Sequence, residues 1–250
     1  MRYNFKNFII LIINMKNVFY INLDERKKRK QTCEKQLQQL GWKFSRFSAI
    51  KHKNGAIGCA MSHLKILENA KKNKLKYVII FEDDFIILDI EKFKKLFKDF
   101  LKQKVSFDVL KLGANAYPPY KEIHDNYVNL NYSQTTHAYM VFDHYYDTLI
   151  KSYKEAIYLL NKYGKGPKGI FCCDSWQNTL IHKYNHTWLL LYPLCVTQKT
   201  DYSDIEKKKV SYSWYFLNLK NTENFRKFAT NKLNLLLDNY DKFKHELENI

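Results

Sequence analysis

Several features that mark particular classes of protein are missing from this 250-residue chain. No apolar run approaches the roughly 20 residues that a membrane-spanning helix needs, and no arginine-rich reading element or aromatic stacking motif is present. Acidic residues are few, with 25 Asp and Glu against 42 Lys and Arg, and glycine (7) and proline (4) are scarce. We attach no function to the scarcity of glycine and proline. The missing apolar run and reading elements predict no membrane span and no specific nucleic-acid partner.

The cysteines give no disulfide framework. There are five of them, an odd number without a C-x-x-C pair, and the two adjacent ones are badly placed to bridge each other. They are Cys33, Cys59, Cys172, Cys173 and Cys195. This usage predicts a reducing compartment, and hence a cytoplasmic protein.

The first 14 residues are apolar but short. The run "FIILII" ends at Asn14, lacks the length of a signal-peptide core, and is followed by no small-x-small cleavage site. We expect 1–14 to form an apolar leader or an extra strand, and a single domain to occupy 15–205. A chain of this length, 46% hydrophobic and 27% charged, can bury one sizeable core.

The net charge of +17 attracts anions such as nucleotides, phosphorylated glycans and acidic membranes. It does not choose among them, because lysines spread over "ERKKRK", "KKNKLK" and "EKKK" equally suit a surface that keeps the protein soluble.

Strand and helix patterns alternate along the chain. "VFYINL" reads as a buried strand, Asp24 can cap a helix that runs to Leu40, and Gly41 can end it. Further strands are expected at 43–50 and 77–81, and further helices at 60–73 and after a cap at Asp89. This order predicts an α/β fold with a mostly parallel central sheet flanked by helices.

Three consecutive acids, Glu82, Asp83 and Asp84, follow the strand at 77–81. Clustered carboxylates repel each other unless a cation or several donors neutralise them, and Mg²⁺ and Mn²⁺ prefer such oxygens. Alternate residues of an extended segment point to one side, so Glu82 and Asp84 can address one metal while Asp83 faces away. A solvated turn that caps the next helix explains the acids equally well.

Four blocks of the sequence, taken in order, resemble glycosyltransferase family 25. They are "VFYINLDERKKRKQ", "GAIGCAMSHLKILENA", "YVIIFEDDFII", and "DSWQNTLIHKY" followed by "YPLCVTQKTDYSDI". This family includes lipooligosaccharide and procollagen galactosyltransferases. The resemblance covers about residues 16–205. It implies a GT-A-like α/β fold, a UDP-sugar donor, usually UDP-galactose, and inversion at the anomeric carbon. It also implies Mn²⁺ or Mg²⁺, and a glycan, lipid-linked glycan or protein acceptor.

The resemblance assigns roles to individual residues. Asp84 and Glu82 would bind the metal, and Asp174 would be the general base that takes the acceptor's proton. Asp174 can instead be an ordinary helix N-cap, and His63 can equally be structural. The residues expected to bind the nucleotide sugar are Asn22, Arg26, Arg29, Gly58, Ser62, His63, Asp83 and Gln198.

Two departures leave a second function open. Ala56 stands where family members commonly carry an acid, and the segment between Ile50 and the block that begins at Gly55 is only Lys51 to Asn54, shorter than is usual in the family. The short segment makes acceptor recognition the feature most in doubt. With the +17 charge, these departures favour the alternative of a basic binding protein that has lost catalysis and binds acidic glycans or membrane surfaces.

The last segment, 206–250, reads as a basic amphipathic helical tail. Its apolar residues alternate with lysines, which suits either packing against the catalytic domain or peripheral contact with the cytoplasmic face of an anionic membrane.

Overall fold

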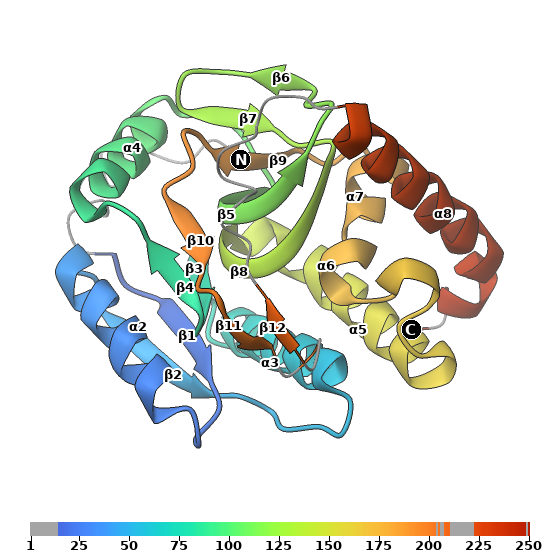
Figure 1. Cartoon of the computed structure of the whole chain (residues 1–250), viewed down its shortest axis with the longest axis horizontal. Coiled ribbons are helices and arrows are strands. Elements are labelled where there is room, and N and C mark those ends of the chain that lie inside the picture. The colour runs from blue at the N-terminus through green and yellow to red at the C-terminus, as the bar shows by residue number, and fades with distance from the viewer. Residues whose placement is uncertain (1–14, 204, 206–207, 211–222, 249) are drawn as a thin grey trace.

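The computed structural model describes residues 15–203, 205, 208–210, 223–248 and 250 (Figure 1). The predicted leader 1–14 and the first part of the tail, including 211–222, lie outside the described residues.

Eight strands form one sheet in the order β2-β1-β3-β8-β5-β9-β7-β6. Their bounds are β1 Val18–Asn22, β2 Phe44–Ser48, β3 Tyr77–Glu82, β5 Val109–Tyr117, β6 Glu122–Ile123, β7 Tyr127–Asn129, β8 Tyr132–Phe142 and β9 Trp188–Leu191. Two small ribbons accompany it: β4 (Phe85–Ile87) pairs with β10 (Val196–Gln198), and β11 (Asp201–Ser203) pairs with β12 (Lys208–Val210).

The helices separate and cover these strands. They are α2 Lys27–Leu40, α3 Gly55–Lys72, α4 Ile90–Lys102, α5 Tyr146–Tyr163, α6 Cys173–Trp176, α7 Asn178–Lys183 and α8 Glu223–Leu247, with short 3-10 turns at Asp143–Tyr145 and Pro167–Gly169. The predicted α/β class, with helices flanking the sheet and a helical C-terminal tail, is confirmed.

The sheet is mixed rather than mostly parallel. β1 runs parallel to β2 and β3, but β8 lies antiparallel between β3 and β5. Parallel neighbours need a crossover of a dozen or more residues, usually a helix. The segment from β5 to β8 contains no helix, only the short sheet strands β6 and β7, and β8 returns in the opposite direction.

Alternation along β3 sends side chains to both faces of the sheet. Val78 and Ile80 belong to the core cluster under α3 and α5, whereas Ile79 and Phe81 belong to the cluster under α2 and α4. Helices therefore cover both faces of β3, which explains its unbroken apolar sequence.

Helix ends follow local capping chemistry. Gly41 ends α2 in a left-handed conformation (φ 73°), as predicted, and Asp89 caps α4 by accepting a hydrogen bond from the Lys92 amide. The Asp24 prediction is wrong: α2 begins after Arg26, because the Asp24 carboxylate binds Arg46 and Ser48 of β2 instead.

The helix α3 begins earlier than the sequence predicts. The Asn54 side chain accepts a hydrogen bond from the Ala56 amide and caps a helix that starts at Gly55, not at 60. The block "IGCAMSHL" therefore lies within this helix.

The tail helix α8 packs on the body of the protein. It lies on the side opposite α2, along α7 (Figure 1). Leu236, Tyr240, Phe243 and Leu247 are buried in the same core cluster as α3 and α5. These apolar side chains are therefore already covered by protein. Among the described helices, none is both long and apolar enough to cross a membrane.

Candidate functional site

A cavity of about 300 Å³ lies at the carboxyl end of β3. It is bounded by α3, by β8, by the loop before α6, by the β10–β11 segment and by one residue of α8. This is where α/β sheets place ligands, beyond the carboxyl ends of strands that neighbour a reversal in strand order. Its acids are Glu82, Asp84, Asp174 and Asp201, and its cations are Arg29, Lys165, Lys168, Lys199 and Lys232.

Glu82 ends β3 on the side of the sheet that faces α3. Its Oε1 accepts a hydrogen bond from Thr136 Oγ1 of β8 (2.7 Å) and lies 3.3 Å from His63 Nε2 of α3. Burial alone would raise the Glu82 pKa, but the hydrogen bond and charge of His63, helped by Thr136, lower it to about 2. Glu82 is therefore ionised at neutral pH.

Asp84 lies in the turn after Glu82 and also lines the cavity. Gln198 of β10 donates to both of its oxygens at 3.3 and 3.4 Å, while Arg29 stays 4.0 Å away. Burial raises the Asp84 pKa to about 7, and the charges of Glu82 and Asp83 add to that effect. The protein therefore only partly compensates the negative charge of the Asp84 carboxylate.

Asp83 points away from the cavity, as its place between the other two acids predicts. It accepts hydrogen bonds from Asn22 Nδ2 (2.6 Å) and Arg29 Nη1 (3.1 Å). Asn22 is buried and also binds Arg46. Neither Asp83 nor Asn22 lines the cavity, so both organise the acidic turn from behind.

Arg29 joins the acidic turn to β11. Its Nε binds Asp201 at 3.2 Å and its Nη2 donates to the Tyr202 carbonyl at 2.7 Å. Arg29 lines the cavity with part of its donors already used by the protein, whereas Arg26 does not line it.

Gly58, Ser62 and His63 do not line the cavity either. Gly58, which was expected to bind the nucleotide sugar, has no free N–H to offer a phosphate, because its amide donates to the Asn54 carbonyl inside α3. Ser62 is fully buried and bonds the Ile50 amide and the Gly58 carbonyl.

Gly58 is instead a packing residue. A Cβ at this position would lie 2.5 Å from the Ile50 carbonyl oxygen, so glycine lets the segment after β2 lie against α3. His63 lies behind the cavity wall and reaches the site through Glu82.

Asp174 lies in the first turn of α6 but is not its N-cap, which is Cys172. Its Oδ2 accepts a hydrogen bond from the Thr135 amide of β8 at 2.9 Å. Thr135 has a left-handed backbone (φ 73°), and the buried Lys111 donates to its carbonyl at 3.1 Å. The pairing of β5 and β8 shifts register nearby. This irregularity turns Gln134, Thr135 and Thr136 toward the cavity.

Several lining residues carried no local signal in the sequence. Lys165 and Lys168 come from the glycine-rich loop "GKGPKG", and Lys232 comes from the tail helix. Cys59 lies inside the block "IGCAMSHL", but nothing in that block distinguishes it from a core cysteine.

The fold and this cavity define an α/β protein whose ligand site combines clustered acids with a cationic rim. A model of the family described as "Glycosyltransferase family 25 (LPS biosynthesis protein)" matches residues 53–186, more than half of the chain. The chain therefore belongs to glycosyltransferase family 25, as its motifs predict.

Two curated relatives match a shorter stretch. They are the "Probable inactive glycosyltransferase 25 family member 3" of Rattus norvegicus and the "Inactive glycosyltransferase 25 family member 3" of Mus musculus, each 35% identical over 71 residues. The match covers 28% of this chain and 12% of each relative, so it spans only a small part of those proteins.

Solved structures resemble this chain only weakly. A glycosyltransferase involved in the glycosylation of the major capsid of PBCV-1 has 9% identity and a TM-score of 0.40, covering 69% of this chain and 79% of that one. Mannose-1-phosphate geranyltransferase from Thermus thermophilus has 10% identity and a TM-score of 0.39, with coverages of 70% and 72%.

Proposed function

We propose that this protein is a metal-dependent inverting glycosyltransferase. It would move a hexose, galactose by family preference, from a UDP-sugar to a hydroxyl of a glycan, lipid-linked glycan or protein. The observation that carries the proposal is the gathering of Glu82, Asp84, Asp174 and a cationic rim around one cavity. Carboxylates in the cavity can bind a divalent cation or accept a proton, and the lysines can bind a diphosphate.

The donor set fits Mn²⁺ or Mg²⁺. Glu82 and Asp84 both face the cavity and repel each other, and Asp84 has no cationic partner closer than Arg29 at 4.0 Å among the described residues. Asp84, with Glu82, would hold the ion, which when bound supplies a Lewis acid that stabilises the leaving diphosphate.

Asp174 would act as the base. Inverting transfer requires a carboxylate that accepts the proton of the acceptor hydroxyl as that oxygen attacks the anomeric carbon. The Thr135 amide fixes Oδ2 of Asp174, which orients the carboxyl group and leaves Oδ1 for the acceptor. Lys165 and Lys168 also line the cavity, in the loop that precedes Asp174.

The first test is turnover of UDP-galactose with Mn²⁺, followed as release of UDP. Asp84→Asn should abolish it, and EDTA should do the same to the unmodified protein, since both remove the ion or its main ligand. The exposed Asp125→Asn serves as a charge-matched control. Full activity in the presence of EDTA would refute the metal-dependent mechanism.

The second test separates chemistry from binding. Asp174→Asn keeps an oxygen that can accept the Thr135 amide, so the fold and the affinity for UDP should be retained. Turnover should fall by about 10²- to 10⁴-fold, the range of general-base contributions. If UDP affinity falls in parallel with turnover, Asp174 is a binding residue and not the base.

A second function is favoured by two observations. Ala56, which stands where an acid is common in the family, lines the cavity, and both curated relatives are named inactive. On this alternative the protein binds acidic glycans or membrane surfaces without catalysis. UDP-galactose would then bind without being turned over, and Asp84→Asn would leave glycan binding unchanged.

For either function we propose a cytoplasmic location, with peripheral contact to the membrane when the acceptor is lipid-linked.

A further inference from the structure

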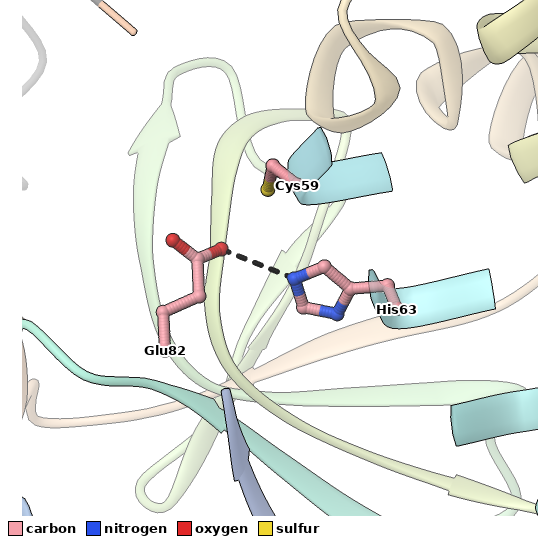
Figure 2. A group of neighbouring side chains, drawn as sticks. All are labelled: Cys59, His63 and Glu82. Atoms are coloured by element: carbon pink, nitrogen blue, oxygen red, sulfur yellow. Dashed lines mark hydrogen bonds and ion pairs between the residues drawn. The ribbon is translucent and has the colours of Figure 1, made fainter. Parts of the chain in front are cut away.

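A second group of possible ligands, chemically different from the acidic turn, lies at the cavity wall, where Cys59 and Glu82 line the cavity and His63 lies behind them. Cys59 and His63 project from α3 toward Glu82 at the end of β3 (Figure 2). One ligand atom from each, a sulfur, a ring nitrogen and a carboxylate oxygen, lies within 4.8 Å of the other two. We propose that this triad is a binding site for a borderline-soft divalent cation of the zinc class, distinct from the hard-ion site at Asp84.

The separation of the ligand atoms suits such an ion. Nitrogen and oxygen ligands at about 2.0–2.2 Å from a tetrahedral zinc lie about 3.4 Å apart, and His63 Nε2 lies 3.3 Å from Glu82 Oε1. A sulfur ligand at about 2.3 Å belongs roughly 3.6 Å from the nitrogen. Because no two of the three ligand atoms are more than 4.8 Å apart, small side-chain shifts on the order of 1 Å can bring the Cys59 sulfur into place.

The surroundings hold the imidazole in a ligating orientation. His63 is fully buried, its ring stacks on Tyr153 at 5.5 Å, and its Nδ1 lies 3.1 Å from the Tyr139 hydroxyl. Metal-binding histidines usually have the second ring nitrogen fixed in this way. When Nδ1 donates to Tyr139, Nε2 presents its lone pair to Glu82, and a cation can replace the proton otherwise shared there.

The site is also reachable and chemically selective. Cys59 and Glu82 line the cavity, so an ion can enter from it. On binding, the Cys59 thiol loses its proton to solvent and the thiolate bonds the ion. A thiolate and an imidazole favour Zn²⁺ or Co²⁺ over Mg²⁺, which prefers oxygen ligands. Glu82 belongs to both sites, but the thiolate and the imidazole belong to the triad alone and hold a soft ion there against excess Mg²⁺.

Co²⁺ tests the proposal without any enzyme assay, since a cobalt–thiolate bond adds a near-ultraviolet charge-transfer band. The unmodified protein should bind one Co²⁺ with this band, and Zn²⁺ should displace it while excess Mg²⁺ should not. Cys59→Ser should abolish the band, whereas Cys172→Ser, which changes a thiol in the same cavity, should keep it. Absence of the band, its survival in Cys59→Ser, or displacement by Mg²⁺ would overturn the proposal.

Alkylation of the unmodified protein gives a second measurement if Cys59→Ser fails to fold. Zn²⁺ should slow the reaction of Cys59 with iodoacetamide at least tenfold, as read by peptide mass mapping, and should leave Cys172 unprotected. Equal protection of both thiols, or none of Cys59, would contradict a site at the triad. Neither result depends on transferase activity, so failure here is separable from failure of the proposed function.

Discussion

Lys111 shows how the protein maintains a charge inside its sheet. It is 2% exposed, and its ammonium group lies between the rings of Tyr139 and Trp188, at 5.3 and 5.2 Å from their centres. Burial lowers the Lys111 pKa to about 8, although the charge of Asp174 opposes the shift. The lysine supports the left-handed Thr135, and thereby the orientation of Asp174, at a cost in stability.

Lys111→Met should reveal that cost through its pH dependence. The folded pKa of about 8 lies below the ordinary 10.5, so between these values the unfolded chain binds more protons. Unfolding free energy of the unmodified protein should therefore rise with pH across this window, relative to Lys111→Met, by on the order of 3 kcal/mol. Urea unfolding of both proteins at about pH 7 and about pH 10 measures the difference. If the difference in unfolding free energy between the two proteins is the same at both pH values, Lys111 does not titrate in this pH range.

At the scale of single elements, α3 joins packing to the site. Its Gly58 allows close approach of the segment after β2, and one turn later His63 reaches Glu82. A small residue at position 58 therefore lets α3 lie close enough for His63, on the next turn, to reach the end of β3.

Gly58→Ala tests the close approach. The new Cβ would meet the Ile50 carbonyl at 2.5 Å, and backbone cannot yield as a flexible side chain can. We expect a loss of about 1–3 kcal/mol in unfolding free energy, typical of overpacking, against almost none for Lys65→Ala on the exposed face of α3. Urea denaturation compares the two, and equal midpoints would mean that the packing is looser than this contact implies.

Elements were more predictable than the contacts between them. The order of strands and helices follows from local periodicity, and the acids after β3 were visible as an interruption of an apolar run. The position of β8 was not predictable from the sequence, because its pairing with β3 joins residues some sixty apart in the chain. Thr136, which bonds Glu82, and Lys232, which lines the cavity from α8, reach the site only through such distant packing. Gly58 and Ser62 were predicted to bind the nucleotide sugar, but they lie outside the cavity and contact the segment after β2 instead.

At the scale of the whole molecule, the C-terminal helix completes the site that the first 205 residues begin. α8 contributes both core residues and Lys232, which is only 5% exposed and whose ammonium group lies 5.8 Å from the centre of the Phe228 ring. A tail that merely anchored the protein to a membrane would not supply a buried cation to the cavity.

Lys232→Met should therefore weaken anion binding while leaving the protein folded, because methionine keeps the apolar stem that packs beside Phe228. Loss of one charge-assisted hydrogen bond, about 1.5–3 kcal/mol, corresponds to at least a tenfold rise in the Kd of pyrophosphate or UDP. Isothermal titration calorimetry measures both ligands. The control is Lys227→Met on the exposed face of the same helix, where the lysine side chain is 69% exposed and should contribute little. Equal Kd values for the two variants would show that the α8 cation serves packing alone and that the donor is held from the α2 and β10 side of the cavity.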